Sequence, residues 1–200
     1  MKILHDVMHL LYSNTFSAGI ANDKEIEEHE KKHNEHVSCT NGELTEHSLH
    51  KLCFFLTQSN DYLHPSHRLT PNSVFVDCRG GFGKSLFHLR VHCATVFDKD
   101  HIPPRVIGIE IEKWRFEMSE KVQLALSRYN KDKFQMKTVE LVKGSFNADV
   151  PLMKSATHLF LLDLLFHPDT LAILSSNVLN TEDSHWMVLI SCLPPKVWMG

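Results

Sequence analysis

The stretch that decides the fold is Ser73-Val-Phe-Val-Asp77-Cys-Arg-Gly80-Gly81-Phe-Gly83-Lys84. Its start is a short apolar run that ends in an acid, which is typical of a buried strand. The glycines that follow permit a tight turn into a helix and let a ligand approach the backbone. Further along, Val106-Ile-Gly108-Ile-Glu110 predicts a second buried strand that ends in an acid. A glycine turn with an acid one βαβ unit later indicates a nucleoside site, in which the carboxylate accepts hydrogen bonds from ribose hydroxyls.

Short apolar runs alternate with helical patterns beyond this stretch, and the alternation predicts a doubly wound, mostly parallel α/β sheet. Runs this short and β-branched are typical of strands that are covered on both faces. The predicted strands cover residues 73–76, 106–110, 138–142, 158–162 and 186–191. The predicted helices cover residues 43–59, 84–95, 112–129 and 168–178.

The first part of the chain differs from the rest. Residues 22–36 are almost all polar and hold too few apolar side chains to enter a core. We therefore expect residues 1–40 to form a helical or disordered appendage and residues 41–200 to form one domain.

Composition argues against several classes of protein. The formal net charge of −3 argues against a broadly basic nucleic-acid binder, and no clear basic tract is visible. No apolar run approaches the roughly 20 residues that span a membrane, so we expect no membrane partner. The 5 cysteines lack a tight paired spacing and are expected to be reduced thiols of an intracellular protein.

The histidines raise the question of a metal site. His29, His33, His36 and Cys39 have spacings that zinc ligands also have. The chain holds 15 histidines, however, so such spacings arise by chance. His88, His92 and Cys93, at helical turn spacing, are expected to form a core or surface face, and no metal site is predicted.

The sequence of the turn favours one kind of nucleoside ligand. A phosphate loop needs Gly-x4-Gly-Lys-Ser/Thr, and Gly80 lies too close to Lys84 for that spacing. Asp77, directly before the turn, would repel a pyrophosphate but suits a ligand with a cationic amino group. These residues therefore favour S-adenosylmethionine over a dinucleotide.

Three segments carry a resemblance to known families. The order Asp-x-x-Gly-Gly-Phe-Gly and then Gly-Ile-Glu resembles the class I S-adenosylmethionine-dependent methyltransferases. Asn41-Gly-Glu43-Leu-Thr45 is similar to the Tyr-Gly-Glu-x-Thr/Ser loop of the non-SET histone lysine methyltransferases, the disruptor of telomeric silencing family. Residues 159–169 are similar to that family's fourth-strand segment. The resemblance covers about residues 41–195 and implies a Rossmann-like class I methyltransferase fold.

The resemblance implies a role for each matching residue. Asp163 would be the catalytic residue, beside the sulfonium and the lysine channel. Glu43 and Thr45 would line the methionine end of the S-adenosylmethionine cofactor, and Glu110 would hold the ribose. The full set of implied cofactor-binding residues is Glu43, Thr45, Asp77, Gly81, Gly83, Glu110, Ser145 and Phe146. The substrate would be a protein, with a histone in the nucleosome as the family's substrate and the nucleus as the compartment; a cytoplasmic location is expected otherwise.

The chain also departs from the family pattern. Arg79 replaces the first glycine of the family's turn, and Ser145 replaces an acid that bonds the adenine amino group. The chain stops at Gly200, so we expect the sheet to lack the family's terminal hairpin strands. These departures leave two alternatives open: a catalytically inactive methyltransferase-like binding module, and a methyltransferase that acts on RNA or another non-histone substrate.

Local structure alone explains some of the same residues. Thr45 can be the N-cap of a helix, and Glu110 can be an acid placed at a helix start. Asp163 can be an ordinary residue at the end of a strand. The glycine turn itself can be a tight connection without a ligand.

Overall fold

The computed structural model describes residues 44–58, 63–97, 104–146, 152, 155–162, 168–179 and 188–191. The expectations for residues 1–40, Glu43 and Asp163 lie outside these ranges. Within them, five strands form one sheet in which every pairing is parallel, and helices pack on the sheet. The predicted α/β class is therefore confirmed. None of the helices in these ranges is long and apolar enough to cross a membrane.

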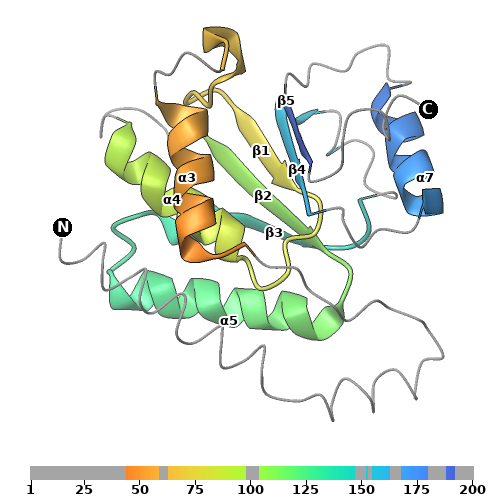
Figure 1. The fold of residues 1–200 in the computed structure, drawn as a ribbon. Helices are drawn as coiled ribbons and strands as arrows, with labels where there is room; N and C mark the ends of the chain where they lie inside the picture. The colour runs from red at the N-terminus through yellow and green to blue at the C-terminus, as the bar shows by residue number, and fades with distance from the viewer. Residues whose placement is uncertain are drawn as a thin grey trace.

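The strand order is β3-β2-β1-β4-β5, which places β1 at the centre of the sheet (Figure 1). The strands are β1 (Val74–Asp77), β2 (Arg105–Glu110), β3 (Glu140–Lys143), β4 (His158–Leu161) and β5 (Val188–Ser191). The helices are α3 (Glu46–Thr57), α4 (Lys84–Val96), α5 (Lys113–Tyr129) and α7 (Pro168–Leu179), with 3-10 turns η1 (Pro65–His67) and η2 (Met136–Thr138). Each predicted helix and strand is present, with bounds shifted by a few residues.

The largest local difference concerns the start of β3. The strand was predicted from residue 138, but η2 occupies residues 136–138 and β3 begins at Glu140. Gln135 has a left-handed φ of 53°, and its carbonyl accepts the N–H of Thr138 at 3.0 Å. Thr138 therefore lies in a 3-10 turn and not in the extended strand, although it is β-branched.

Apolar side chains cover the sheet on both faces. Phe75 and Phe160 point to the face that α3, α4 and α5 cover, and their rings stack with centroids 6.0 Å apart. Val76 and Leu159 point to the opposite face, where α7 contributes Leu174. Because neighbouring residues of a strand point to opposite faces, strands covered on both sides must be apolar throughout. This explains the continuous apolar runs in the sequence.

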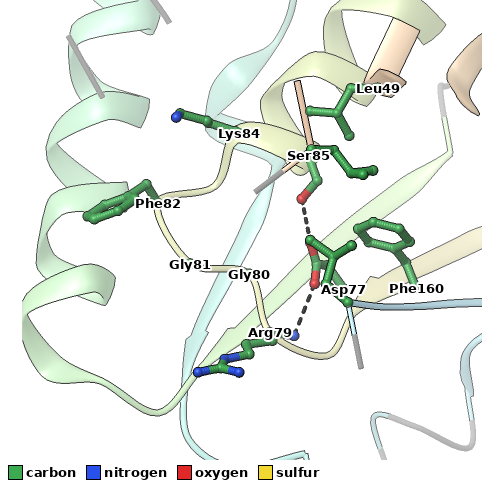
Figure 2. Close-up of a pocket in the computed structure, with 11 residues that line it drawn as sticks. Leu49, Asp77, Arg79, Gly80, Gly81, Phe82, Lys84, Ser85 and Phe160 are labelled. Carbon is green, nitrogen blue, oxygen red and sulfur yellow. Dashed lines mark hydrogen bonds between the residues drawn. The ribbon is translucent and has the colours of Figure 1, made fainter. Parts of the chain in front are cut away.

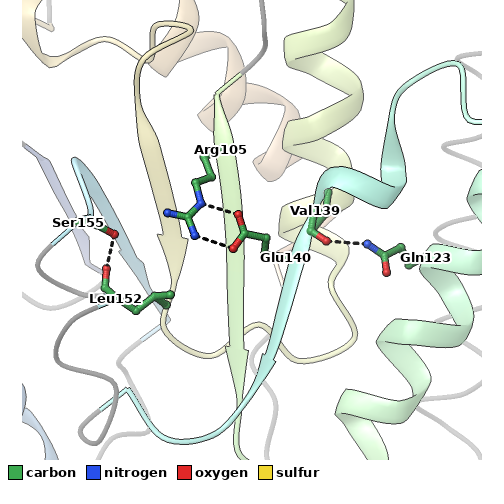
Figure 3. Close-up of polar contacts among 6 residues, drawn as sticks. All are labelled: Arg105, Gln123, Val139, Glu140, Leu152 and Ser155. Carbon is green, nitrogen blue, oxygen red and sulfur yellow. Dashed lines mark hydrogen bonds and ion pairs between the residues drawn. The ribbon is translucent and has the colours of Figure 1, made fainter.

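Polar contacts fasten β3 to its neighbours at the end of the sheet opposite the glycine turn (Figure 3). Arg105 Nη2 lies 2.7 Å from Glu140 Oε2 and joins the start of β2 to the start of β3. These side chains are 46% and 40% exposed, so the ion pair adds at most about 1 kcal/mol. The amide of Gln123 on α5 donates to the carbonyls of Met136 (2.9 Å) and Val139 (2.7 Å). These bonds hold the α5–β3 connection in place.

Candidate functional site

The glycine turn runs from the carboxyl end of β1 into α4, as predicted (Figure 2). The N–H of Gly80 donates to the carbonyl of Ile109 on β2 at 2.8 Å. A Cβ on Gly80 would lie 3.3 Å from the Cα of Gly108, so the turn packs directly on the backbone of β2. The turn is therefore held between the two strands that carry the predicted acids.

Asp77 is a buried carboxylate at the inner side of this turn, 3% exposed. Its Oδ1 accepts the backbone N–H of Arg79 at 3.0 Å, and its Oδ2 accepts the hydroxyl of Ser85 (Figure 2). Burial raises the pKa of Asp77 from 3.8 to about 6, although both hydrogen bonds act to lower it. A cation beside this carboxylate would lower its pKa and stabilise the charged form. Such an environment suits a ligand that bears an amino group.

Glu110 ends β2 and reaches back to the same turn. Its Oε2 accepts the N–H of Gly81 at 2.8 Å, and its Oε1 accepts the N–H of Glu112 at 2.8 Å, just before α5. Part of its role is therefore structural, as an acid near a helix start. A carboxylate has about four lone-pair sites, so each oxygen retains an acceptor site for a hydroxyl group.

A pocket opens beside the turn, where β1 and β4 lie next to each other. From β1 the chain builds β2 and β3 on one side and then returns to the other side as β4. Ligands of open parallel sheets bind at such a switch point, beyond the carboxyl ends of the strands. The empty space beside the turn is about 520 Å³ with open solvent included, but only about 40 Å³ of it is cavity, which is less than the roughly 300–1,000 Å³ of small-molecule sites. The lining residues are Leu44, Leu49, Asp77, Arg79, Gly80, Gly81, Phe82, Lys84, Ser85, Phe160 and Leu162.

The structure brings only some of the predicted site residues to this pocket. Asp77 and Gly81 line it, and the carboxylate of Glu110 accepts the N–H of Gly81 without lining the pocket. Ser145 follows the next strand end, where the N–H of Gly144 donates to the carbonyl of Glu110 at 3.0 Å. Phe146 packs in the core on the α7 side of the sheet, 9% exposed. The adenine contacts expected of Ser145 and Phe146 stay predictions.

Gly83 supports the turn and does not line the pocket. Its φ is 81°, a left-handed conformation, and a Cβ would lie 2.5 Å from Cε2 of the buried Phe87 ring. We expect Gly83→Ala to lower the free energy of unfolding by about 2 kcal/mol, because backbone strain and displacement of the ring add. Urea unfolding measures this loss.

Gly81→Ala is the matched control for that variant. Gly81 also has a positive φ of 53°, but a Cβ there meets nothing closer than the carbonyl of Arg79 at 3.9 Å. We expect it to lose about 1 kcal/mol, from backbone strain alone. Equal losses in the two variants would contradict the contact between position 83 and Phe87.

Thr45 lies at the start of α3 and acts as its N-cap. Its Oγ1 accepts the N–H of Ser48 at 3.2 Å, which explains why the helix begins at Glu46 and not at residue 43. We expect Thr45→Ala to lower the free energy of unfolding by about 1 kcal/mol. Thr45→Ser keeps the hydroxyl and should keep the stability. Thermal unfolding compares the two variants, and an equally stable Thr45→Ala would rule out the cap.

Sequence analysis missed several residues of the pocket. Ser85, in the first turn of α4, could have been found because a helix that starts at Lys84 places it directly after the turn, within reach of Asp77. Phe160 could not, because it depends on sheet register: β4 pairs with β1 so that Phe160 lies opposite Asp77. Leu49 arrives only because α3 packs against α4.

Histidines of α3 and α4 form a cluster in which the two from α4 are buried and His50 of α3 is exposed. His88 and His92 are 2% and 8% exposed, and their ring centroids lie 6.1 and 5.8 Å from that of His50. His92 Nε2 lies 2.8 Å from Thr57 Oγ1. The expectation that His88, His92 and Cys93 form a core face is confirmed. In the ranges that the structure describes, no three potential ligands are placed to hold a metal ion, and residues 29–39 lie outside those ranges.

Comparison with models of known protein families finds no match to this chain, and a search of curated proteins finds no similar sequence. Fold and site define the class of protein at a coarser level. The chain is an α/β protein whose parallel sheet carries a pocket, a buried acid and a glycine turn at its switch point.

Proposed function

We propose that this chain is an S-adenosylmethionine-dependent methyltransferase. The observation that carries the proposal is the pair of buried acids, Asp77 and Glu110, which end adjacent strands and bond to one glycine turn. The strand order supports it, since β3-β2-β1-β4-β5 is the order of the Rossmann-like nucleotide-binding sheets. The position of Asp77 before the turn argues for an amino group rather than a pyrophosphate.

The described residues fit such a cofactor. A Cβ on Gly81 would meet only the carbonyl of Arg79, at 3.9 Å, so a ligand can approach the turn at this position. Asp77 would hold the amino group, and the remaining acceptor sites of Glu110 would hold the ribose hydroxyls. Ile111, directly after Glu110, is 61% exposed and offers an apolar surface to the base. S-adenosylmethionine would supply an electrophilic methyl group on a cationic sulfur.

The chain's own task in methyl transfer is to position a neutral nucleophile. The nucleophile must lie about 3 Å from the methyl carbon, in line with the leaving group. A lysine amine, with an ordinary pKa near 10.4, loses its proton more easily in apolar surroundings. Leu44, Leu49, Phe160 and Leu162 provide such surroundings in the pocket. Asp163, next in sequence after Leu162, would orient the amine.

The substrate that we propose first is a protein lysine, with a histone in the nucleosome as the test case. Its support is the resemblance of residues 41–45 and 159–169 to the non-SET histone lysine methyltransferases, which would place the protein in the nucleus. RNA and non-histone proteins are the competing substrates. The small negative net charge of the chain favours a protein over RNA.

A second candidate function is a binding module that keeps the sheet without catalysis. Two observations favour it: Arg79 occupies the place of a turn glycine, and both oxygens of Glu110 already accept backbone N–H groups. Transfer of labelled methyl groups from S-adenosylmethionine to nucleosomes, free histones and RNA separates the candidates. Cofactor binding without transfer to any of them would favour the binding module.

Calorimetric titration of S-adenosylhomocysteine tests the cofactor site directly. We expect micromolar affinity in the wild type and at least a tenfold loss in Glu110→Gln, since a ribose hydroxyl bond to an ionised acceptor is among the stronger kinds. Glutamine retains one oxygen for the N–H of Gly81, whereas alanine would release the turn. Glu120→Gln, on the exposed side of α5, is the matched control and should leave the affinity unchanged. A folded wild-type chain that binds no ligand would contradict the proposal.

A further inference from the structure

Basic side chains gather where α5 ends and the chain turns toward β3. Residues 128–137 hold a single acid, Asp132, and its Oδ1 accepts the backbone N–H of Lys137 at 3.4 Å. In the part of the chain that the structure describes, no carboxylate lies within ion-pair distance of the basic side chains of this segment. The basic patch, as we define it, consists of the exposed residues Arg128, Tyr129, Lys131, Lys133 and Lys137.

The segment folds back against the last turn of α5. The N–H of Asp132 donates to the carbonyl of Ser127 at 2.7 Å, and the N–H of Lys131 donates to that of Arg128 at 3.4 Å. Lys131 and Asp132 have left-handed φ angles of 51° and 56°. Residues with a Cβ rarely adopt this conformation, and it persists where the surrounding structure enforces it, often at functional sites. The reversal keeps the basic side chains of the segment close to Arg128.

Buried contacts fix the segment in place. Phe134 and Met136 are buried, whereas Lys133 and Lys137 beside them are exposed. Arg90 on α4, 2% exposed, donates through Nε to the carbonyl of Phe134 at 3.0 Å, and its Nη2 lies 2.7 Å from Oε1 of Gln135. The cations are therefore presented on a pre-organised backbone, which lowers the entropy cost of binding a partner.

The basic patch lies far from the pocket. α5 begins beyond the carboxyl end of β2 and runs back along the sheet to the connection with β3 (Figure 1). Its 17 residues span about 25 Å. The patch therefore lies at the end of the sheet opposite the glycine turn, and an inference about it does not depend on the proposed methyl transfer.

We propose that the basic patch binds single-stranded nucleic acid. Four cations complement the phosphates of one strand, and Tyr129, 53% exposed, offers a ring on which a base can stack. A single strand exposes the faces of its bases, whereas a duplex covers them. A flat anionic membrane fits less well, because Glu117 and Glu120 are exposed further along α5 and would be repelled by it. The net charge of −3 belongs to the whole chain and does not describe this local surface.

Fluorescence anisotropy with a labelled oligouridine measures this binding in the full chain. Each phosphate contact on a single strand contributes about −0.7 to the slope of log affinity against log salt concentration, so four contacts give a slope of about −2.8. We therefore expect the affinity to fall about fifty-fold between about 50 and about 200 mM salt.

Three variants separate charge from stacking. Lys131→Gln combined with Lys133→Gln removes two contacts and should halve the slope to about −1.4. Tyr129→Ala should lower the affinity at least fivefold and leave the slope unchanged. Lys51→Gln combined with Lys113→Gln removes the same charge from exposed positions on α3 and at the start of α5. This control should keep the affinity and the slope of the wild type.

Several results would overturn the inference. A folded wild type that does not bind oligouridine at low salt is the first, and equal weakening in the control and in the patch variant is the second. Unchanged affinity in Tyr129→Ala would rule out stacking on this ring. Tighter binding to a duplex of the same length, or to vesicles of phosphatidylserine and phosphatidylcholine, would assign the patch to a different partner. None of these results bears on binding of S-adenosylhomocysteine, which is measured separately.

Discussion

Asp77→Asn is expected to stabilise the chain and at the same time to weaken its ligand binding at least tenfold. The folded-state pKa of Asp77 is raised by burial from 3.8 to about 6, so the folded chain holds this proton more tightly than the unfolded chain. The stability that this group contributes is present below pH 3.8 and is lost as the pH rises through 6. At pH 8 the buried charge lowers the free energy of unfolding by about 3 kcal/mol, which asparagine avoids.

The variant keeps the local hydrogen bonds. The asparagine oxygen can accept the N–H of Arg79, and the hydroxyl of Ser85 can accept from the new amide. We therefore expect a gain in urea unfolding free energy of about 2 to 3 kcal/mol at pH 8 and roughly half of that at pH 5. Glu120→Gln, on the surface, should show neither the gain nor its pH dependence.

Ligand binding completes this test. An amino group loses its charged partner in Asp77→Asn, so affinity for S-adenosylhomocysteine should fall at least tenfold. A variant that is more stable but binds the ligand more weakly would show that the buried charge of Asp77 lowers stability and serves ligand binding. Unchanged affinity would contradict the role of Asp77, and lower stability at pH 8 would contradict the buried charge.

Acid is expected to destabilise the packing of α3 on α4 through His88 and His92. Burial, together with a smaller contribution from the neighbouring His50 ring, lowers the pKa of His88 from 6.5 to about 3 and that of His92 to about 4. Between pH 4.5 and 6.5 these two histidines therefore bind protons in the unfolded chain and remain mostly neutral in the folded chain. The stability is present above pH 6.5 and falls as the pH falls below it, by about 2 kcal/mol for each ring at pH 4.5.

Unfolding in urea between pH 7 and pH 4.5 measures this dependence. His88→Gln should lose about 2 kcal/mol less than the wild type over this range, because one of the two rings no longer titrates. His47→Gln, exposed on α3, is the matched control and should follow the wild type. Asp77 has the opposite pH dependence, but it is present in the wild type and in both variants, so its contribution cancels when their unfolding free energies are compared. Equal slopes in His88→Gln and the wild type would rule out the buried ring as the cause.

The sequence by itself determined the elements and the chemistry of the turn. Helical and strand periodicities depend on neighbours along the chain, so they located each described helix and strand, and the predicted order of strand, glycine turn and helix is confirmed. The same local information placed Asp77 and Glu110 at strand ends. The two open interpretations of Thr45 were also local, and the structure shows the cap.

Only the tertiary structure decided what meets at that turn. Pairing of β4 with β1 sets Phe160 opposite Asp77, and packing of α3 brings Leu49 to the same pocket. Burial, which raises the pKa of Asp77, is likewise a property of the assembled sheet and helices. Patterns along the chain do not encode these features, because contacts between residues far apart in sequence depend on strand order and register, which the packing of the whole core selects.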